Sequence, residues 1–308
     1  MNTPHFLRLG VAAVQRLSPE LASHVAEGLF FTPPRAPLTP EVRAFLSTGT
    51  RRDVNVAEGR VITWRWGRGP VVYLMHGWGG RGGRLHAFAR PLLSAGCSVV
   101  TFDAPGHGHS SGRRSSMPQF ASALEAVVAT HGPVHGIVAH SMGASATALA
   151  ISRGLPVRRA VFLGPAADPG AFAALFARLF GFTGDAMDRM RRRTERRLRF
   201  RWDQLSVPAM ARDLRAAPPL LVVHDHDDPT VAWSDGAAIA GAWPGAELVT
   251  TTGLGHRGVV RDPAVVAQAV TFLTGAASAP ASLDTRDEAA LLEHELFNRE
   301  TRSLQAWP

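Results

Sequence analysis

The stretch VHGIVAHSMG, residues 134–143, decides the fold class of this chain. Its first six residues form a short, largely apolar run, typical of a strand that is buried on both faces of a parallel sheet. The run leads into Ser141, and a helix of small residues follows at once. A serine at such a sharp strand-to-helix turn exposes its hydroxyl at the end of the sheet, where the first free helix N–H groups also point. Strand and helix nearly touch there, so small residues are needed on both sides of the serine. Ala139 and Gly143 meet that need, although the usual motif has glycine at both positions.

Similar apolar runs recur along the chain, and a stretch with helical periodicity follows each of them. This alternation predicts an α/β fold, in which a mostly parallel sheet carries helices on both faces. An antiparallel hairpin formed by 53–56 and 61–66 precedes the alternating part. The expected strands lie at 70–75, 98–102, 134–139, 160–163, 220–223 and 247–250, and the expected helices at 85–94, 117–130, 142–153, 232–242 and 263–273.

The same patterns divide the chain into a core domain at 51–273 and two flanking segments. Residues 1–50 are expected to be helical and to pack outside the domain or to gate its mouth; one helix begins at Ser18-Pro19 and repeats apolar residues at helical spacing (Leu21, Val25 and Leu29). Within the core domain, 168–217 has helical character and no strand. We expect it to be a lid inserted after the sixth strand, because insertions at the carboxyl ends of parallel strands lie over the ligand crevice. Residues 274–308 read as a linker and a short acidic helix at 287–297.

Composition argues against several classes of function. The formal charge is +8, but every basic residue is Arg and a single Tyr offers little for base stacking, so we expect no nucleic-acid partner. No run of 18 apolar residues predicts a membrane span, and the N-terminus has no pattern of a cleaved secretory signal. Cys97 is the one cysteine, which rules out a disulfide or a thiolate metal cluster within the chain. We therefore expect a cytoplasmic protein.

A glycine-rich loop follows the strand at 70–75, in the sequence HGWGG at 76–80. Glycines let backbone N–H groups approach a bound oxygen closely. We expect the N–H groups of Trp78 and Met142 to form an oxyanion hole. The glycines could also suggest a phosphate cradle, but no Lys follows them and the spacing is not that of a P-loop.

A cluster of charged residues, HDHDDP at 224–229, follows the strand at 220–223. A carboxylate just beyond the end of a late strand is where the acid of a catalytic triad is expected. Asp228 is favoured because the run Asp-Pro-Thr-Val at 228–231 looks like the usual surroundings of that acid, while Asp225 and Asp227 remain open. The alternative is a metal site formed by His224, His226 and Asp228, although no second cluster of matching ligands accompanies it.

His256 lies on a glycine-flanked loop after the last expected strand, which completes the order serine, aspartate, histidine. That order belongs to one fold and differs from those of chymotrypsin and subtilisin. With the segment DAPGHGHS at 103–110, which is similar to D-x-P-G-H-G-x-S, the chain resembles the α/β-hydrolase superfamily from about Arg51 to Leu273. Epoxide hydrolases and haloalkane dehalogenases share that segment but use an aspartate nucleophile, so Ser141 argues against both.

The resemblance implies a serine hydrolase with Ser141, Asp228 and His256 as its triad and no metal or organic cofactor. We expect it to cleave an ester or thioester of a small apolar molecule or acyl chain. The alternatives are transfer of the acyl group to another acceptor, C–C hydrolysis or cofactor-free peroxidation by the same triad, and a non-catalytic scaffold.

The lid suggests where a substrate would bind. Its apolar residues recur at helical spacing and, with His140, are candidate substrate contacts (Phe172, Phe176 and Phe180), although the stripe could equally pack the lid onto the domain. An arginine-rich run at 189–199 reads as a solvated helix face. It could instead contact an anionic substrate group or, with the apolar N-terminus, give weak contact with a membrane surface.

Overall fold

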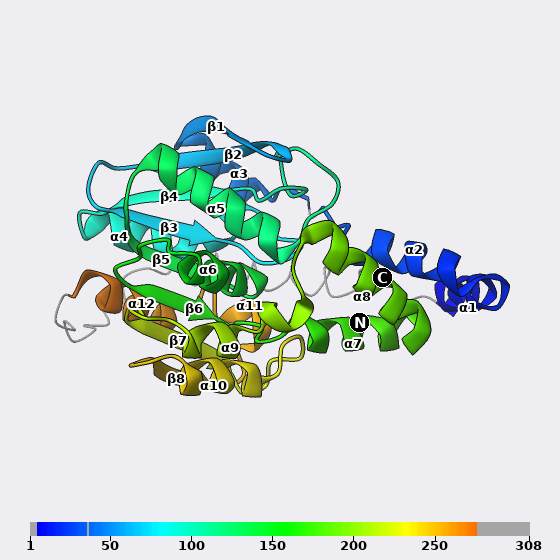
Figure 1. The fold of residues 1–308 in the computed structure, drawn as a ribbon. Coiled ribbons are helices and arrows are strands. Elements are labelled where there is room, and N and C mark those ends of the chain that lie inside the picture. Colours follow the sequence, from blue (N-terminus) through cyan, green and yellow to red (C-terminus); the bar gives the residue numbers. More distant parts are fainter. Residues whose placement is uncertain (1–4, 36, 276–308) are drawn as a thin grey trace.

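The computed structural model of the chain describes residues 5–35 and 37–275. The predicted acidic helix at 287–297 lies outside the described residues. The element order confirms the predicted α/β class, in which a largely parallel sheet is flanked by helices (Figure 1). None of the described helices has the length and apolar content that crossing a bilayer requires.

The sheet has eight strands in the order β1-β2-β4-β3-β5-β6-β7-β8. The hairpin β1–β2 is antiparallel and β2 pairs antiparallel with β4, whereas all the later pairs are parallel. The parallel pairs bring the carboxyl ends of β5, β6 and β7 to one edge of the sheet. The strands are β1 (Thr50–Val56), β2 (Gly59–Trp66), β3 (Val71–Met75), β4 (Ser98–Phe102), β5 (Val134–His140), β6 (Ala160–Leu163), β7 (Leu220–Asp225) and β8 (Glu247–Thr251).

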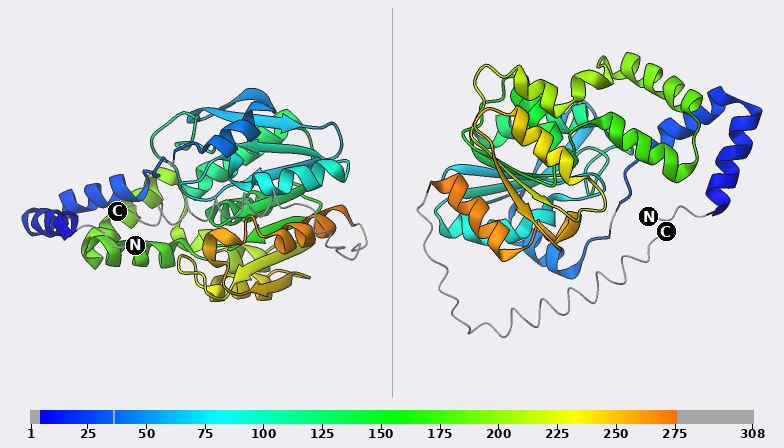
Figure 2. Two further views of the ribbon diagram at one scale, coloured as in Figure 1. Left: turned by 180° about the vertical axis from the view of Figure 1, so that it is seen from behind. Right: turned by 90° about the horizontal axis from the view of Figure 1, so that it is seen from below.

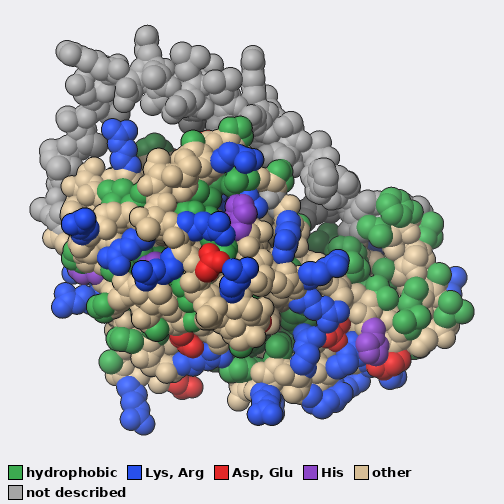
Figure 3. All heavy atoms as spheres, turned by 90° about the horizontal axis from the view of Figure 1, so that it is seen from above, with side chains coloured by type: hydrophobic (Ala, Val, Ile, Leu, Met, Phe, Trp, Pro, Cys, Tyr) green, Lys and Arg blue, Asp and Glu red, His purple; other side chains and the backbone are tan. Residues whose placement is uncertain are grey.

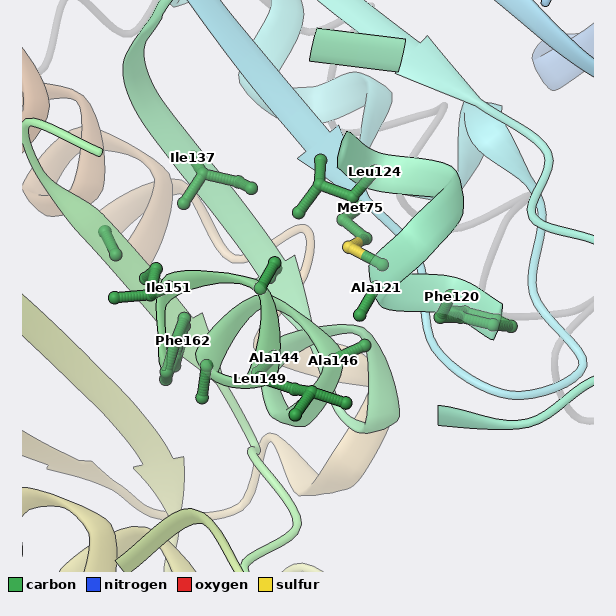
Figure 4. Packing of buried hydrophobic residues seen from close by; sticks show 14 of the residues in the cluster. Met75, Phe120, Ala121, Leu124, Ile137, Ala144, Ala146, Leu149, Ile151 and Phe162 are labelled. Atoms are coloured by element: carbon green, nitrogen blue, oxygen red, sulfur yellow. The ribbon is translucent and has the colours of Figure 1, made fainter. Parts of the chain in front are cut away.

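The central strands are buried on both faces, which explains why their sequences lack a polar alternation. In β3, Tyr73 and Met75 pack into one core, and Val72 and Leu74 pack into the other. The first core lies under α5 (Met117–His131) and α6 (Met142–Ser152), and Figure 4 shows its packing. Each such side chain contributes about 1.5–3 kcal/mol on burial.

Other helices complete the two layers. The face with α5 and α6 also carries α9 and α10, and the opposite face carries the 3₁₀ segment η1 with α4 and α12. Their bounds are η1 (Gly82–Phe88), α4 (Ala89–Ser94), α9 (Val207–Arg212), α10 (Trp233–Ala242), α11 (Gly255–Gly258) and α12 (Pro263–Thr274).

The N-terminal segment contains three helices, α1 (His5–Leu17), α2 (Pro19–Phe30) and α3 (Pro40–Ser47). As predicted, Ser18 caps α2: its hydroxyl accepts a hydrogen bond from the Leu21 N–H at 3.1 Å. The side of α2 that is buried, however, carries small or polar residues (Ala22, Ser23, Ala26 and Glu27), while Leu21 and Leu29 are exposed. The small residues let α2 approach its neighbour closely, so Leu21 and Leu29 of the predicted stripe face outward, while Val25 packs partly against the core of the neighbouring helices.

Between β6 and β7 the chain forms α7 (Pro169–Phe180), α8 (Gly184–Leu198), the 3₁₀ segment η2 (Trp202–Leu205) and α9, with no strand among them. The helices α7 and α8 pack with α1 and α2 in a lobe that projects from the sheet, as Figures 1 and 2 show. We call α1, α2, α7 and α8 the helical lobe. It has its own apolar core, formed by Val11, Ala22, Ala26, Phe31, Ala173, Phe176, Phe182, Ala186, Met190 and Trp202.

Candidate active site

Ser141 stands at the turn between β5 and α6 with φ 53° and ψ −127°. A backbone conformation this sparsely populated costs a non-glycine residue roughly 1–3 kcal/mol, so the surrounding structure must hold it. The Ser141 N–H donates to the Leu163 carbonyl at 2.9 Å. Close packing also holds the turn in this conformation, since a Cβ at Gly143 would lie 2.4 Å from the carbonyl oxygen of His76. The turn therefore presents the serine at the carboxyl edge of the sheet.

Asp228 and His256 meet at the same edge. The Nδ1 atom of His256 lies 2.6 Å from Oδ2 of Asp228. The other carboxylate oxygen accepts backbone N–H groups from Thr230 at 2.7 Å and Val231 at 2.9 Å. Burial raises the pKa of the Asp228 carboxyl, but hydrogen bonds from His224, His256 and the backbone outweigh it, and the pKa lies well below its usual range. Asp228 is therefore ionised at neutral pH and orients His256.

The two other aspartates of the cluster have different partners. Asp225 is fully buried, and its Oδ2 accepts the Thr251 hydroxyl at 2.8 Å and the Leu254 N–H at 3.0 Å. Asp227 is exposed and accepts the Gly253 N–H at 3.1 Å. Both carboxylates stabilise the loop before His256 through these hydrogen bonds. Of the three aspartates, only Asp228 contacts the His256 ring.

Two residues connect the Asp228–His256 pair to the serine turn. His140, which directly precedes Ser141, lies with Nε2 2.9 Å from the His256 carbonyl, and the two rings are 4.6 Å apart. Gly164, which directly follows Leu163, packs against the pair: a Cβ there would lie 3.3 Å from His256 Nδ1 and 3.4 Å from Asp228 Oδ2. The segments that follow β5, β7 and β8 thus bring Ser141, Asp228 and His256 into one region at the carboxyl edge of the sheet.

The loop after β3 lies directly against the serine. A Cβ at Gly77 would be 2.8 Å from Cβ of Ser141, so the loop approaches as closely as a glycine allows. Trp78 follows, and the Gly79 N–H donates to Nε2 of His107 at 3.1 Å. Within the described part of the chain, the N–H groups of Trp78 and Met142 donate to no protein acceptor. The two N–H groups that the sequence suggested for an oxyanion hole are therefore not engaged by protein acceptors in that part of the chain.

Two buried histidines hold this loop in place. His76 Nε2 accepts the Ala104 N–H at 3.0 Å, and its Nδ1 lies 2.7 Å from the Gly77 carbonyl. His107 accepts from Gly79 in the same way and directs its Nδ1 to the Pro105 carbonyl at 2.9 Å. Each ring is thus a neutral tautomer with a proton on Nδ1. Burial lowers the pKa of His76 to about 4 and that of His107 to about 3.

The segment at 103–110, which contributed to the family resemblance, supports the loop structurally. Asp103 is fully buried, and its carboxylate accepts the Gly82 and His109 N–H groups, both at 2.7 Å. Its carboxylate forms no hydrogen bond with His256.

His224 is a supporting residue that the sequence reading treated only as a metal ligand. It is fully buried, and its Nε2 lies 3.1 Å from the Val231 carbonyl and 3.5 Å from Oδ2 of Asp228. A Cβ at Gly236 would lie 2.3 Å from its Nδ1, so a glycine makes room for the ring. The other histidine of the metal alternative, His226, is exposed and pairs with Asp227. No group of three potential metal ligands occurs among the described residues.

The three phenylalanines suggested as substrate contacts lie in the helical lobe. Phe176 is buried in the core of the helical lobe, 5.2 Å from Phe30 and 4.7 Å from Phe180 between ring centroids. Phe172 lies 5.5 Å from Phe30 and is partly exposed. His140 is buried against His256. Phe30 of the N-terminal helix α2 thus packs against two of the three phenylalanines that the sequence suggested for an acyl chain.

Three of the seven arginines in the run at 189–199 form ion pairs with glutamates on α2. Arg193 and Arg197 on α8 both form ion pairs with Glu27, which is buried on α2, and the Arg193 contact is 2.5 Å. Arg189 and Arg193 also pair with Glu20. These arginines therefore attach α2 to α8, although Arg189 and Arg197 also remain partly exposed.

Comparisons with known proteins agree with this architecture. A family model described as "Alpha/beta hydrolase family" matches residues 71–269. A curated relative, the pimeloyl-[acyl-carrier protein] methyl ester esterase of Methylococcus capsulatus, is 52% identical over 44 residues. That match covers 14% of this chain and only 17% of the relative's length.

Solved structures with the same fold include esterases and a peroxidase. An esterase from Pyrococcus furiosus has a TM-score of 0.59 at 17% identity, covering 79% of this chain and 98% of its own. An esterase from Rhodococcus sp. has a TM-score of 0.56 at 19% identity (73% and 98%). A bromoperoxidase from Bacillus anthracis has a TM-score of 0.56 at 16% identity (74% and 100%). At these identities the likeness concerns the fold alone.

Proposed function

Since the chain belongs to the alpha/beta hydrolase family, we propose that it is a serine hydrolase that cleaves a carboxylic ester through an acyl-enzyme. The observation that carries the proposal is the 2.6 Å contact between His256 and Asp228 beside the strained turn of Ser141. A buried aspartate that orients a histidine close to a half-buried serine on a strained turn is the arrangement that activates a hydroxyl as a nucleophile.

The contact of His256 with Asp228 decides which ring nitrogen can act as the general base. Asp228 occupies Nδ1 of His256, so Nε2 is the nitrogen left to take the proton of Ser141 as its oxygen attacks the ester carbonyl. Asp228 then stabilises the imidazolium that forms. The imidazolium protonates the leaving alcohol, and a water activated by the same Nε2 releases the acid and restores the serine.

Stabilisation of the tetrahedral oxyanion falls to the N–H groups of Trp78 and Met142. Each such donor is worth roughly 3 kcal/mol in the barrier, because it is already oriented before the charge develops. His107 contributes indirectly, since its bond to the Gly79 N–H holds the loop that carries Trp78.

The substrate class proposed is a small ester. The short match to a methyl ester esterase and the esterases among the structural neighbours support this choice over transfer to another acceptor. A resident metal or organic cofactor has no role in these steps.

A series of p-nitrophenyl esters of increasing acyl length tests the proposal. We expect Ser141→Ala to lose turnover by at least about 10³-fold, because the nucleophile is gone. The matched control is Ser152→Ala, at the other end of α6. Its hydroxyl donates to the Leu149 carbonyl at 2.8 Å and lies 3.6 Å from the sulfur of Met210. Equal turnover by Ser141→Ala and wild type would refute the proposal.

Trapping separates hydrolysis from the other chemistries. A fluorophosphonate should label the wild type at Ser141, detected by mass spectrometry of its peptide, and leave Ser141→Ala unlabelled. Added methanol should compete with water only weakly. Dominant methyl ester formation would instead identify an acyltransferase.

A further inference from the structure

The exposed large hydrophobic side chains of the described residues gather on one part of the molecule. Leu17 is 82% exposed and Phe6 71% exposed. Leu248, on β8, is the one member of the set that lies outside the helical lobe. The lobe carries Phe6, Leu7, Leu9, Leu17, Leu21, Leu29 and Phe172. Single exposed hydrophobic residues are ordinary on protein surfaces, but a cluster of this kind marks a contact surface.

These side chains do not belong to the apolar core of the lobe. The helix α1 buries Val11 against the lobe, while Phe6, Leu9 and Leu17 lie on other sides of the same helix. In α2 the small residues face inward and Leu21 and Leu29 face outward. Both helices therefore expose large apolar side chains that the lobe's own core does not bury.

The charge around this surface is positive. Arg8 and Arg16 on α1 and Arg178 on α7 are exposed, and none of them forms an ion pair within the described part of the chain. The lobe's acidic residues are largely neutralised, since Glu20, Glu27, Asp185 and Glu195 all pair with arginines and Asp188 is the exception. Figure 3 shows hydrophobic side chains spread over the projecting lobe, with a row of basic side chains beside them.

We propose that the outward face of α1 and α2 docks onto an anionic lipid bilayer. Its leucines and phenylalanine would enter the boundary between headgroups and acyl chains, and its arginines would contact anionic headgroups. A symmetric dimer through the same face is disfavoured, because it would bring Arg8 and Arg16 of the two copies together without acidic partners. The proposal does not depend on the triad, so it stands or falls separately from the proposed function.

Sedimentation of the full chain with vesicles tests the apolar contribution. The vesicles contain phosphatidylcholine and phosphatidylglycerol at about 70:30, with pure phosphatidylcholine as the comparison. We expect the double variant Leu17→Gln/Leu21→Gln to lower the partition coefficient at least about tenfold, because two exposed leucines no longer transfer out of water. Leu248→Gln is the matched control and should bind like wild type, as Leu248 is 37% exposed but lies on β8. Equal binding by the double variant would overturn the proposal.

The charge contribution has its own variant. Arg8→Gln/Arg16→Gln should weaken binding to the anionic vesicles about tenfold or more and make it less dependent on salt. Binding of wild type that is equally strong on pure phosphatidylcholine would contradict an anionic surface.

A fluorophore distinguishes the lipid from other occupants. An environment-sensitive dye is attached to Leu17→Cys, and the buried Cys97 should not react. A blue shift on addition of anionic vesicles supports the proposal, and the same shift in a Ser141→Ala background keeps it independent of catalysis. Emission that is already blue-shifted without vesicles would overturn it. If that emission does not depend on protein concentration, the chain's own residues 276–308 cover the dye. If it shifts further as protein concentration rises, a second copy covers it.

Discussion

Asp228 Oδ2 lies 2.6 Å from His256 Nδ1, and the aspartate side chain is only 1% exposed. The contact joins the loop after β7 to α11, two segments that lie 28 residues apart in the chain. Asp225 ends β7 and Asp227 lies just before Asp228, yet these two carboxylates hold backbone N–H groups and a hydroxyl instead. The direction of each side chain therefore decides which of the neighbouring aspartates contacts His256.

Asp228→Asn should reduce kcat/KM for a p-nitrophenyl ester by about 10³–10⁴-fold, because an amide donor in place of Oδ2 favours the wrong tautomer of His256. Asp225→Asn should instead mainly lower the melting temperature, since it disturbs the buried bonds to Thr251 and Leu254. Asp227→Asn, at an exposed position, should do neither. Steady-state kinetics and thermal melts on the three variants check this, and the larger kinetic loss in a well-folded Asp225→Asn would reassign the acid.

His76 and His107 should make the fold sensitive to mild acid. Their pKa values are about 4 and about 3 in the folded protein, against an ordinary value near 6.5 in the unfolded chain. Below pH 6.5 the unfolded state binds more protons, so the free energy of unfolding falls as the pH drops toward the folded values. Between pH 6.5 and pH 5 each histidine should cost about 2 kcal/mol.

Urea unfolding of wild type and His107→Gln at pH 7 and pH 5 measures this effect. A glutamine oxygen can still accept the Gly79 N–H but does not titrate, so the variant should lose about 2 kcal/mol less than wild type over this pH interval. Identical pH dependence of the two proteins would show that His107 is not neutral and buried as described.

Gly143→Ala should destabilise the protein by about 3 kcal/mol and abolish turnover, because a methyl group there would meet the His76 carbonyl at 2.4 Å. The backbone must shift to relieve that contact, and the serine turn shifts with it. Gly241→Ala on α10 is the control: nothing lies within 4 Å of its Cβ position, and alanine should stabilise the helix by up to about 1 kcal/mol. Chemical denaturation together with ester hydrolysis separates the two effects, and a fully active Gly143→Ala would disprove the tight turn.

Glu27→Gln should loosen the N-terminal helices from α8. The carboxylate is buried and pairs with Arg193 and Arg197, which are themselves partly exposed, so we expect a loss of about 1–3 kcal/mol in the free energy of opening the lobe. Trypsin should then cleave within α8 about ten times faster under native conditions. Glu20→Gln, an exposed member of the same set of ion pairs, is the control and should change the cleavage rate little.

Much of the architecture could be predicted because its signals are local. The strands at 98–102 and 160–163 were predicted with the bounds that the structure gives β4 and β6. Burial on both faces leaves an uninterrupted apolar run, which is readable without knowing the partners. The cap at Ser18 was equally local, since its hydroxyl bonds a backbone group three residues away.

The surroundings of the candidate site could not be read in this way. The sequence suggested that Phe176 and Phe180 could meet a substrate, but α2 from the N-terminus packs against the same lid helices. Periodicity shows that a helix has an apolar side, and it says nothing about which distant element covers that side. For the same reason the pairing of Arg193 with Glu27, 166 residues earlier, left no trace in the sequence pattern.

By itself, the sequence determined the alternation of strands and helices, the small residues around Ser141, and the chain order of serine, aspartate and histidine. Each of these depends on packing or backbone geometry within a few residues. Only the tertiary structure decided that Asp228 rather than Asp225 reaches His256, and that Leu21 faces outward while Ala22 faces α8. Those choices depend on contacts between segments far apart in the chain, where a rotation of one residue along a loop or helix changes the partner.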